Sequence, residues 1–159
     1  DDELKLTIIG GTKDLSFGQL VDRIGVNLGL DFPCGAQMDI LSSSTTRKAP
    51  KVKTDGYFNI SGMENYFKNI DDLLDGEVYY LLFSTISNIL LDSITYLGNK
   101  YKVDEVILVG GVSSNSIIKD QLSSKLKANG IKCHVADSDY CKDNAIGSAY
   151  YSLIKSNKL

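Results

Sequence analysis

Two glycines and an asparagine follow a run of apolar residues in ILVGGVSSNS, residues 107–116. Glycine has no side chain, so the backbone N–H groups of Gly110 and Gly111 can approach a bound ligand closely. Their predicted place, after a strand and just before a helix, is where open α/β sheets bind ligands, and it suits a nucleotide. The stretch matches neither GxGxxG nor GK[ST], so a simple tight turn stays open as the alternative.

A carboxylate and another glycine lie earlier in the chain. Asp22 stands between Val21 and Arg23 in a predicted helix. A carboxylate there can accept hydrogen bonds from two sugar hydroxyls, each contributing roughly 1.5 to 3 kcal/mol. The alternative is a local ion pair on the helix surface. In DFPCGAQ, Gly35 follows a proline turn and can bring backbone to the same ligand.

Asp143 in YCKDNAIGSA can act as a helix N-cap or as a metal ligand. The only histidine, His134, lies in an alternating strand, where we expect a structural role. Metal sites need several ligands, so a metal would take its other ligands from outside this chain. The sequence has no serine nucleophile elbow and no HExxH motif, which argues against the common routes of hydrolysis.

Strands alternating with helices must position these residues, and the pattern predicts the α/β class with right-handed parallel crossovers. The longest predicted helix starts at Gly76 and is apolar along one face. Residues 103–109, VDEVILV, are almost continuously apolar, which is typical of a strand covered on both faces of its sheet. The predicted strands are 4–9, 57–60, 103–109 and 131–135, and the predicted helices are 14 or 16 to 28, 36–41, a short one capped by Ser61, 76–99, 115–128 and one from about 143.

The composition is that of an ordinary soluble domain. The 159 residues are 43% hydrophobic and 23% charged, enough for one domain with a core, and the net charge of −3 argues against a surface that coats nucleic acid overall. The apolar runs are too short for a membrane span, the acidic start DDE is unlike a signal peptide, and three widely spaced cysteines suit a reducing compartment. We expect free thiols, no membrane, a cytoplasmic location and a chain that starts inside a longer protein.

One segment is basic. Residues 43–55 form a predicted flexible loop whose cations are Arg47, Lys48, Lys51 and Lys53. Such a run is usually a solvated loop. It is also the candidate in this sequence for contact with RNA.

Together these segments resemble the carboxyl-terminal half of the tRNA threonylcarbamoyladenosine transferase family, historically labelled glycoprotease or O-sialoglycoprotein endopeptidase. The resemblance covers nearly the whole chain through IGGTKDLSFGQLVDRIGVNLGLDFPCG, FNISGMEN, GGVSSN and YCKDNA. The spacing of Asp22 from Gly35 and of Asn115 from Asp143 matches the family pattern. The resemblance implies a single ribonuclease H-like domain of the actin-like ATPase superfamily over residues 1–159, facing an amino-terminal domain across a nucleotide cleft.

The resemblance also implies which residues bind ligands. Contacts to ATP or to the threonylcarbamoyl-adenylate donor would come from Asp22, Gly35, Gly110, Gly111 and Asn115. Secondary contacts would come from Gln19, Ser61 and Gly62. Asp143 would complete an iron or zinc site whose histidine ligands belong to the amino-terminal half. The complete protein would transfer a threonylcarbamoyl group to adenosine 37 of tRNA together with partner subunits, and the isolated domain would be inactive.

Three residues depart from the family pattern. Gln19 replaces a glutamate, Cys34 replaces a glycine and Glu64 replaces a lysine. These changes are expected to alter nucleotide affinity, so a catalytically silent nucleotide-binding paralogue stays open. A sugar or acetate kinase-type phosphotransferase shares the fold, but YCKDNA is not a kinase signature.

Overall fold

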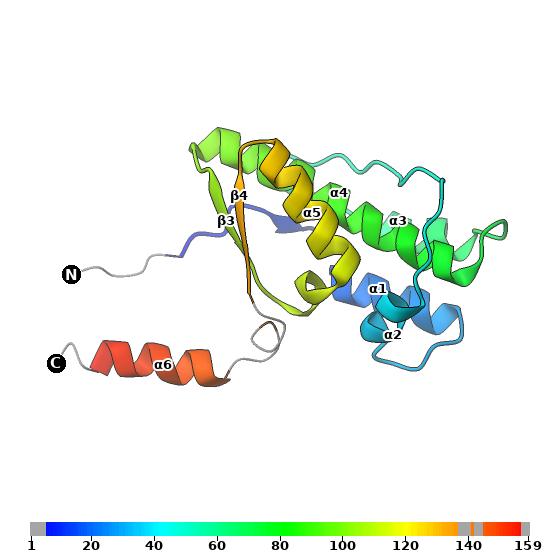
Figure 1. Ribbon diagram of the computed structural model, residues 1–159, viewed down its shortest axis with the longest axis horizontal. Coiled ribbons are helices and arrows are strands. Elements are labelled where there is room, and N and C mark those ends of the chain that lie inside the picture. Colours follow the sequence, from blue (N-terminus) through cyan, green and yellow to red (C-terminus); the bar gives the residue numbers. More distant parts are fainter. Residues whose placement is uncertain (1–5, 137–140, 142–144, 157–159) are drawn as a thin grey trace.

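The computed structural model describes residues 6–136, 141 and 145–156, and it has the predicted α/β class (Figure 1). The elements in chain order are β1 (Gly11–Thr12), α1 (Phe17–Asn27), α2 (Gly35–Leu41), β2 (Tyr57–Phe58), α3 (Ser61–Lys68), α4 (Asp75–Tyr101), β3 (Glu105–Leu108), a 3-10 turn η1 (Gly111–Ser114), α5 (Ser116–Ala128), β4 (Lys132–Val135) and α6 (Ala145–Ser156). The helices therefore outweigh the strands in the described residues.

Helix α4 is the central element, as its apolar periodicity predicted. Its first turn is closed by Glu77, whose carboxylate accepts from the N–H of Leu74 at 3.1 Å. It ends at Lys102, which adopts the left-handed conformation with φ of 58°. The helix is long and apolar enough to cross a bilayer, but half of its most apolar stretch is buried inside the protein. It is the core helix of this fold.

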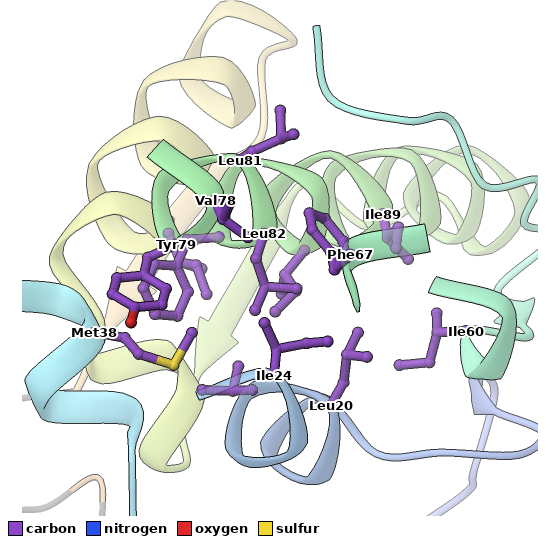
Figure 2. Close-up of a cluster of buried hydrophobic side chains, with 14 of the residues drawn as sticks. Leu20, Ile24, Met38, Ile60, Phe67, Val78, Tyr79, Leu81, Leu82 and Ile89 are labelled. Carbon is purple, nitrogen blue, oxygen red and sulfur yellow. The ribbon is translucent and has the colours of Figure 1, made fainter. Parts of the chain in front are cut away.

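The first hydrophobic cluster fills the space between α4 and the shorter helices α1, α2, α3 and α5 (Figure 2). Leu20 and Ile24 from α1, Met38 from α2 and Leu82 from α4 are completely buried there. The close packing depends on Gly25, because a Cβ at this position would overlap the Cβ of Cys34. Helix α1 and the turn before α2 are thus in direct contact.

The second hydrophobic cluster lies between α5 and a two-stranded parallel sheet of β3 and β4, in which Val106 pairs with Cys133. Helix α5 covers one face of this sheet through Leu122 and Leu126. On the other face Ile107 is 70% exposed. The expectation of a sheet covered on both faces is therefore wrong for the described residues.

The predicted strand at residues 4–9 is also not formed as expected. In the described part of the chain, residues 6–10 have no strand partner, and only Gly11–Thr12 pairs, in parallel, with Tyr57–Phe58. An isolated extended segment gains no ladder hydrogen bonds, so strand propensity alone does not make a strand.

The predicted basic loop runs from α2 to β2 without helix or strand and passes along α4 (Figure 1). The hydroxyls of Thr54 and Ser93 of α4 lie 2.9 Å apart, and Ala49 and Val52 pack against the first hydrophobic cluster. Lys51 and Lys53 are exposed. The loop therefore packs against the rest of the protein through Ala49, Val52 and Thr54. Its flexibility remains a prediction.

Candidate functional site

The two glycines after β3 form an open turn. Gly110 has φ of +102°, a conformation that side chains disfavour, and it precedes η1, which starts at Gly111. A Cβ on either glycine would meet no atom of the described residues within 4 Å, so the backbone here is open with respect to that part of the chain. The hydroxyls of Ser113 and Ser114 donate to the carbonyls of Gly110 and Gly111, at 2.7 and 2.6 Å, and fix the turn.

Asn115 links this turn to α5. Its side-chain oxygen accepts from the N–H of Ile118 at 3.0 Å and caps the helix. Its side-chain amide nitrogen is buried and has no hydrogen-bond partner among the described residues, although the residue is only 7% exposed. Buried polar groups are nearly always paired, so an unpaired amide at this position is unusual.

Asp22 on α1 lies close to Gly35 at the start of α2. One carboxylate oxygen of Asp22 accepts from the N–H of Cys34 at 2.9 Å, so Asp22 holds the turn before α2 rather than making the local ion pair that was the alternative. Gly35 opens α2, and its Cβ position lies 3.9 Å from a methyl group of Val21.

The thiol of Cys34, the residue whose N–H donates to Asp22, is fully buried. Burial raises its pKa, and the charges of Asp22 and Asp31 raise it further. A thiol with a raised pKa stays protonated and is a poor nucleophile. Cys34 therefore supports the turn and is not a catalytic group.

Two contacts bring these segments to one place. The Cβ position of Gly18, near the start of α1, lies 4.0 Å from Val112 of η1. Asp39 of α2 accepts from the N–H and the hydroxyl of Ser116 at 2.9 and 2.7 Å, which ties α2 to the start of α5. The elements so joined carry five of the predicted site residues: Asp22, Gly35, Gly110, Gly111 and Asn115. No sequence signal pointed to Asp39, because its partner lies far away in the chain.

Asp143 lies outside the described residues, so its predicted metal role stays a prediction. The nearby Cys141 is described and buried, and its sulfur lies 3.9 Å from the hydroxyl of Ser113 and 3.4 Å from the carbonyl of Ala136. Among the residues that the structure describes, no three His, Cys, Asp or Glu side chains gather as a metal site. His134 instead lies 3.0 Å from Glu105, the structural role predicted for it.

A surface hollow of about 480 Å³ opens beside Asp22 on the outer face of α1. It is lined by Gln19, Asp22, Arg23, Val26, Asn27, Phe32 and Lys68. Gln19, one of the three departures from the family pattern, closes the capping box of α1, since its side-chain oxygen accepts from the N–H and hydroxyl of Ser16, both at 3.1 Å. A glutamine performs this structural task as well as a glutamate.

Ser61 and Gly62 lie on α3, and no described contact joins them to the glycine turn. Ser61 was predicted to cap α3, but the cap position is Ile60 and the carboxylate of Asp14 accepts from the N–H groups of both residues, at 2.9 and 3.0 Å. The hydrogen bond from Ile60 is the main reason why the pKa of Asp14 lies well below its usual range. The sequence predicted residue 14 only as one of two possible starts of the helix that contains α1.

Glu64, the charge-reversing departure, lies between two cations. Its carboxylate is 2.8 Å from the guanidinium of Arg23 and 2.6 Å from the ammonium group of Lys68. Lys68 first and Arg23 second lower the pKa of Glu64, so the carboxylate is charged at neutral pH. The negative charge is therefore compensated locally.

Two crystal structures of HypF share the fold. T. kodakarensis HypF gives a TM-score of 0.71 at 18% identity, over 85% of this chain and 19% of that one. Full-length HypF in the phosphate- and nucleotide-bound form gives 0.67 at 16% identity, over 81% of this chain and 19% of that one. The fold and the site define an α/β domain with an open turn at a strand end, where such folds bind ligands.

Sequence comparisons then give the family. The sequence model of the family TsaD, tRNA N6-adenosine threonylcarbamoyltransferase, matches residues 1–150, and the chain belongs to this family. Relatives of that name include one from Malacoplasma penetrans (strain HF-2), 32% identical over 161 residues, and one from Staphylococcus aureus (strain N315), 28% identical over 173 residues. These alignments cover 91% and 99% of this chain but 50% of each relative. The chain spans about half the length of the curated relatives that it matches, and the resemblance seen in its motifs is confirmed.

Proposed function

We propose that the complete protein transfers a threonylcarbamoyl group to adenosine 37 of tRNA in the cytoplasm, with partner subunits. This chain would be its carboxyl-terminal domain, with a ribonuclease H-like fold of the actin-like ATPase superfamily. The observation that carries the proposal is the family match over residues 1–150. In the reaction, the exocyclic amine of the adenosine attacks the carbamoyl carbon of the donor and the adenylate leaves.

The role of this chain would be to bind the adenine nucleotide. The open backbone of Gly110 and Gly111 would lie against the adenosine. The second carboxylate oxygen of Asp22 would accept from ribose hydroxyls beside the backbone of Gly35. The amide of Asn115 has no partner among the described residues and supports this arrangement, because a ligand acceptor would satisfy its buried N–H groups.

The proposal includes a bound metal, whose predicted ligand Asp143 lies outside the described residues. Asp143 would supply one ligand to iron or zinc, and the others would come from the amino-terminal half. A bound metal would orient the donor and polarise its carbonyl as a Lewis acid.

Calorimetric titration of the full-length protein with ATP tests the nucleotide site. Asp22→Asn keeps an acceptor for Cys34 but loses the charge, and we expect at least about a tenfold rise in Kd, since a hydrogen bond to a charged group contributes about 1.5 to 3 kcal/mol. Asp31→Asn removes a charge from the same exposed turn and is expected to change Kd little. Equal affinity of the two variants would reject Asp22 as a ligand.

Metal analysis and transfer assays on the full-length protein distinguish a transferase from a catalytically silent binding module. In the transferase, Asp143→Ala is expected to lose the bound metal, measured by elemental analysis, and the transfer of the threonylcarbamoyl group with it. Nucleotide binding by a wild-type protein that holds no metal and transfers nothing would instead support the binding module.

The basic loop is the proposed contact with tRNA. Arg47 already pairs with Asp72 at 2.5 Å, whereas Lys48, Lys51 and Lys53 are exposed and no ion pair joins them to another described residue. Changing the three lysines to glutamine is expected to lower the slope of log K against log salt by about 0.7 to 0.9 for each phosphate that the loop no longer neutralises. Arg47→Gln is the matched control and is expected to change the slope less. An unchanged slope in the triple variant would rule the loop out.

A further inference from the structure

The carboxyl-terminal end of α4 carries exposed aromatic rings beside lysines. Tyr96 and Tyr101 are both exposed large side chains. The ammonium group of Lys100 lies 5.9 Å from the centre of the Tyr96 ring and 5.5 Å from the centre of the Tyr101 ring. Lys102, which ends the helix, is exposed as well. This end of α4 therefore presents two rings and two positive charges on the surface of the described residues.

The basic loop reaches the same face of α4. The hydroxyls of Thr54 and Ser93 lie 2.9 Å apart, and a Cβ on Gly56 would lie 2.7 Å from the side chain of Leu97. Residues three and four apart are neighbours on a helix surface. The face that the loop touches therefore includes the residues at this spacing: Ser93, Tyr96, Leu97 and Lys100.

Positive charge collects where the loop meets the helix. Lys51 and Lys53 of the loop are exposed, like Lys100 and Lys102. In the part of the chain that the structure describes, no ion pair joins any of these four lysines to a carboxylate. Three exposed carboxylates lie near them in the sequence, at Asp55, Asp92 and Asp104. The surface is therefore positive in a chain whose net charge is −3.

We propose that this surface, the α4 platform of Tyr96, Lys100, Tyr101, Lys51 and Lys53, binds an unpaired stretch of RNA in the tRNA substrate. Proteins that bind single strands combine aromatic side chains, on which bases stack, with cations that follow the phosphates. The tyrosines would stack on two bases and the lysines would neutralise the phosphates beside them. The proposal rests on the proposed function, because it takes its RNA from the tRNA substrate of that reaction.

The α4 platform lies far from the glycine turn. It is at the amino end of β3, whereas Gly110 and Gly111 follow the carboxyl end (Figure 1). Residues 103–109 connect the two and, at about 3.3 Å for each strand residue, span roughly 20 Å. The α4 platform therefore does not touch a base that reacts at the glycine turn. It contributes to the affinity for tRNA and not to the chemical step.

Fluorescence anisotropy of the full-length protein with a short oligouridine tests the stacking. Tyr96→Leu and Tyr101→Leu keep apolar bulk but remove the rings, and each is expected to raise Kd at least about fivefold. Tyr151→Leu on α6 is the matched control and is expected to leave Kd unchanged, since Lys155 lies over that ring at the same 5.9 Å as Lys100 over Tyr96. Figure 1 shows α6 far from the basic loop. Unchanged Kd in the first two variants, or an equal rise in the control, would overturn the proposal.

An RNA duplex of the same length separates stacking from a general loss of binding. Paired bases cannot stack on side chains, so the duplex is expected to bind Tyr96→Leu and the wild type equally. Equal losses for the duplex and the single strand would overturn the stacking. A change in oligomeric state with unchanged Kd would assign the surface to a second copy of the chain and overturn the proposal as well.

Salt dependence separates the lysines from the rings. Lys100→Gln is expected to lower the slope of log K against log salt by about 0.7, the value for one phosphate of a single strand, whereas Tyr96→Leu leaves the slope unchanged. Lys127→Gln, at an exposed position on α5, is the matched control and is expected to leave the slope unchanged. An unchanged slope for Lys100→Gln would overturn the phosphate contact.

Transfer kinetics link the α4 platform to tRNA. In a protein that transfers, Tyr96→Leu is expected to raise KM for tRNA and to leave kcat unchanged, because the ring contributes equally to substrate and transition-state binding. An unchanged KM would overturn the role in tRNA binding. Weaker binding of oligouridine by the two tyrosine variants of a protein that transfers nothing would reject the transferase proposal and leave the RNA-binding surface intact.

Discussion

The first and second hydrophobic clusters differ in how completely this chain encloses them. The first is surrounded by helices, and side chains such as Leu20, Ile24 and Leu82 are fully buried there. The second lies between the two-stranded sheet of β3 and β4 and the helices α5 and α4, and the other face of this sheet is open at Ile107. The first cluster is therefore enclosed on all sides by the described residues, whereas the sheet of the second is covered on one face only.

The candidate site lies where the two clusters meet. Helix α5 starts in the first cluster with Ile118 and continues into the second with Leu122 and Leu126. Asn115 caps the end of α5 that the first cluster fixes, and Asp39 holds the same end from α2. The glycine turn proposed to bind the nucleotide is therefore positioned by the enclosed part of the molecule, which favours a preformed site.

A matched pair of leucine substitutions gives the largest expected effect. Leu82 and Leu122 are both fully buried, one in each cluster. We expect Leu82→Ala to cost about 4 kcal/mol of unfolding free energy and Leu122→Ala about 2 kcal/mol, because the cost of a cavity depends on how well its surroundings can collapse into it. Urea denaturation of both variants measures the difference.

The complete protein provides the control for this pair. There, any segment that packs on the exposed face around Ile107 would restrain the second cluster, and the two costs would then be closer. If the costs are already equal in this chain, the second cluster is as rigid as the first and the comparison between them is wrong.

The sequence predicted best the elements that this chain completes by itself. The periodicity of α4, the glycine turn after β3 and the order of the motifs are properties of local segments, and the structure has each of them. Residues 4–9 were predicted as a strand from their apolar character, but a strand also needs a neighbour to pair with, and the described residues 6–9 have none among the described residues. The contacts of Asp14 with Ile60 and of Asp39 with Ser116 join distant segments, so no local pattern could reveal them.

Substitution of Asp14 is expected to give the next largest effect on stability, because Asp14 holds the start of α3 beside the first cluster. Its carboxylate accepts from the N–H groups of Leu15, Ile60 and Ser61, which depress its pKa in the folded protein. The stabilisation is fully present above the unperturbed pKa of about 3.9 and is lost as the pH falls towards the folded value. Asp14→Asn is expected to be less stable at neutral pH and to lose less stability between pH 5 and pH 3, measured by urea denaturation at each pH. A pH dependence identical to that of the wild type would show that the carboxylate does not hold α3.

The smallest expected effect compares one surface carboxylate from each region. Glu64 forms ion pairs with Arg23 and Lys68 beside the first cluster. Glu105 forms ion pairs with Lys132 and His134 on the exposed face of the β3–β4 sheet. The side chain of Glu64 is 18% exposed and that of Glu105 is 56% exposed, so water and salt screen Glu105 more. Glu64→Gln is expected to lower the urea midpoint slightly and Glu105→Gln hardly at all. Both shifts are expected to shrink in about 1 M salt, where the screening length is about 3 Å. A larger loss from Glu105→Gln would mean that the ion pairs on the exposed face of the β3–β4 sheet stabilise the protein more than those beside the first cluster, which would weaken the contrast between the two regions.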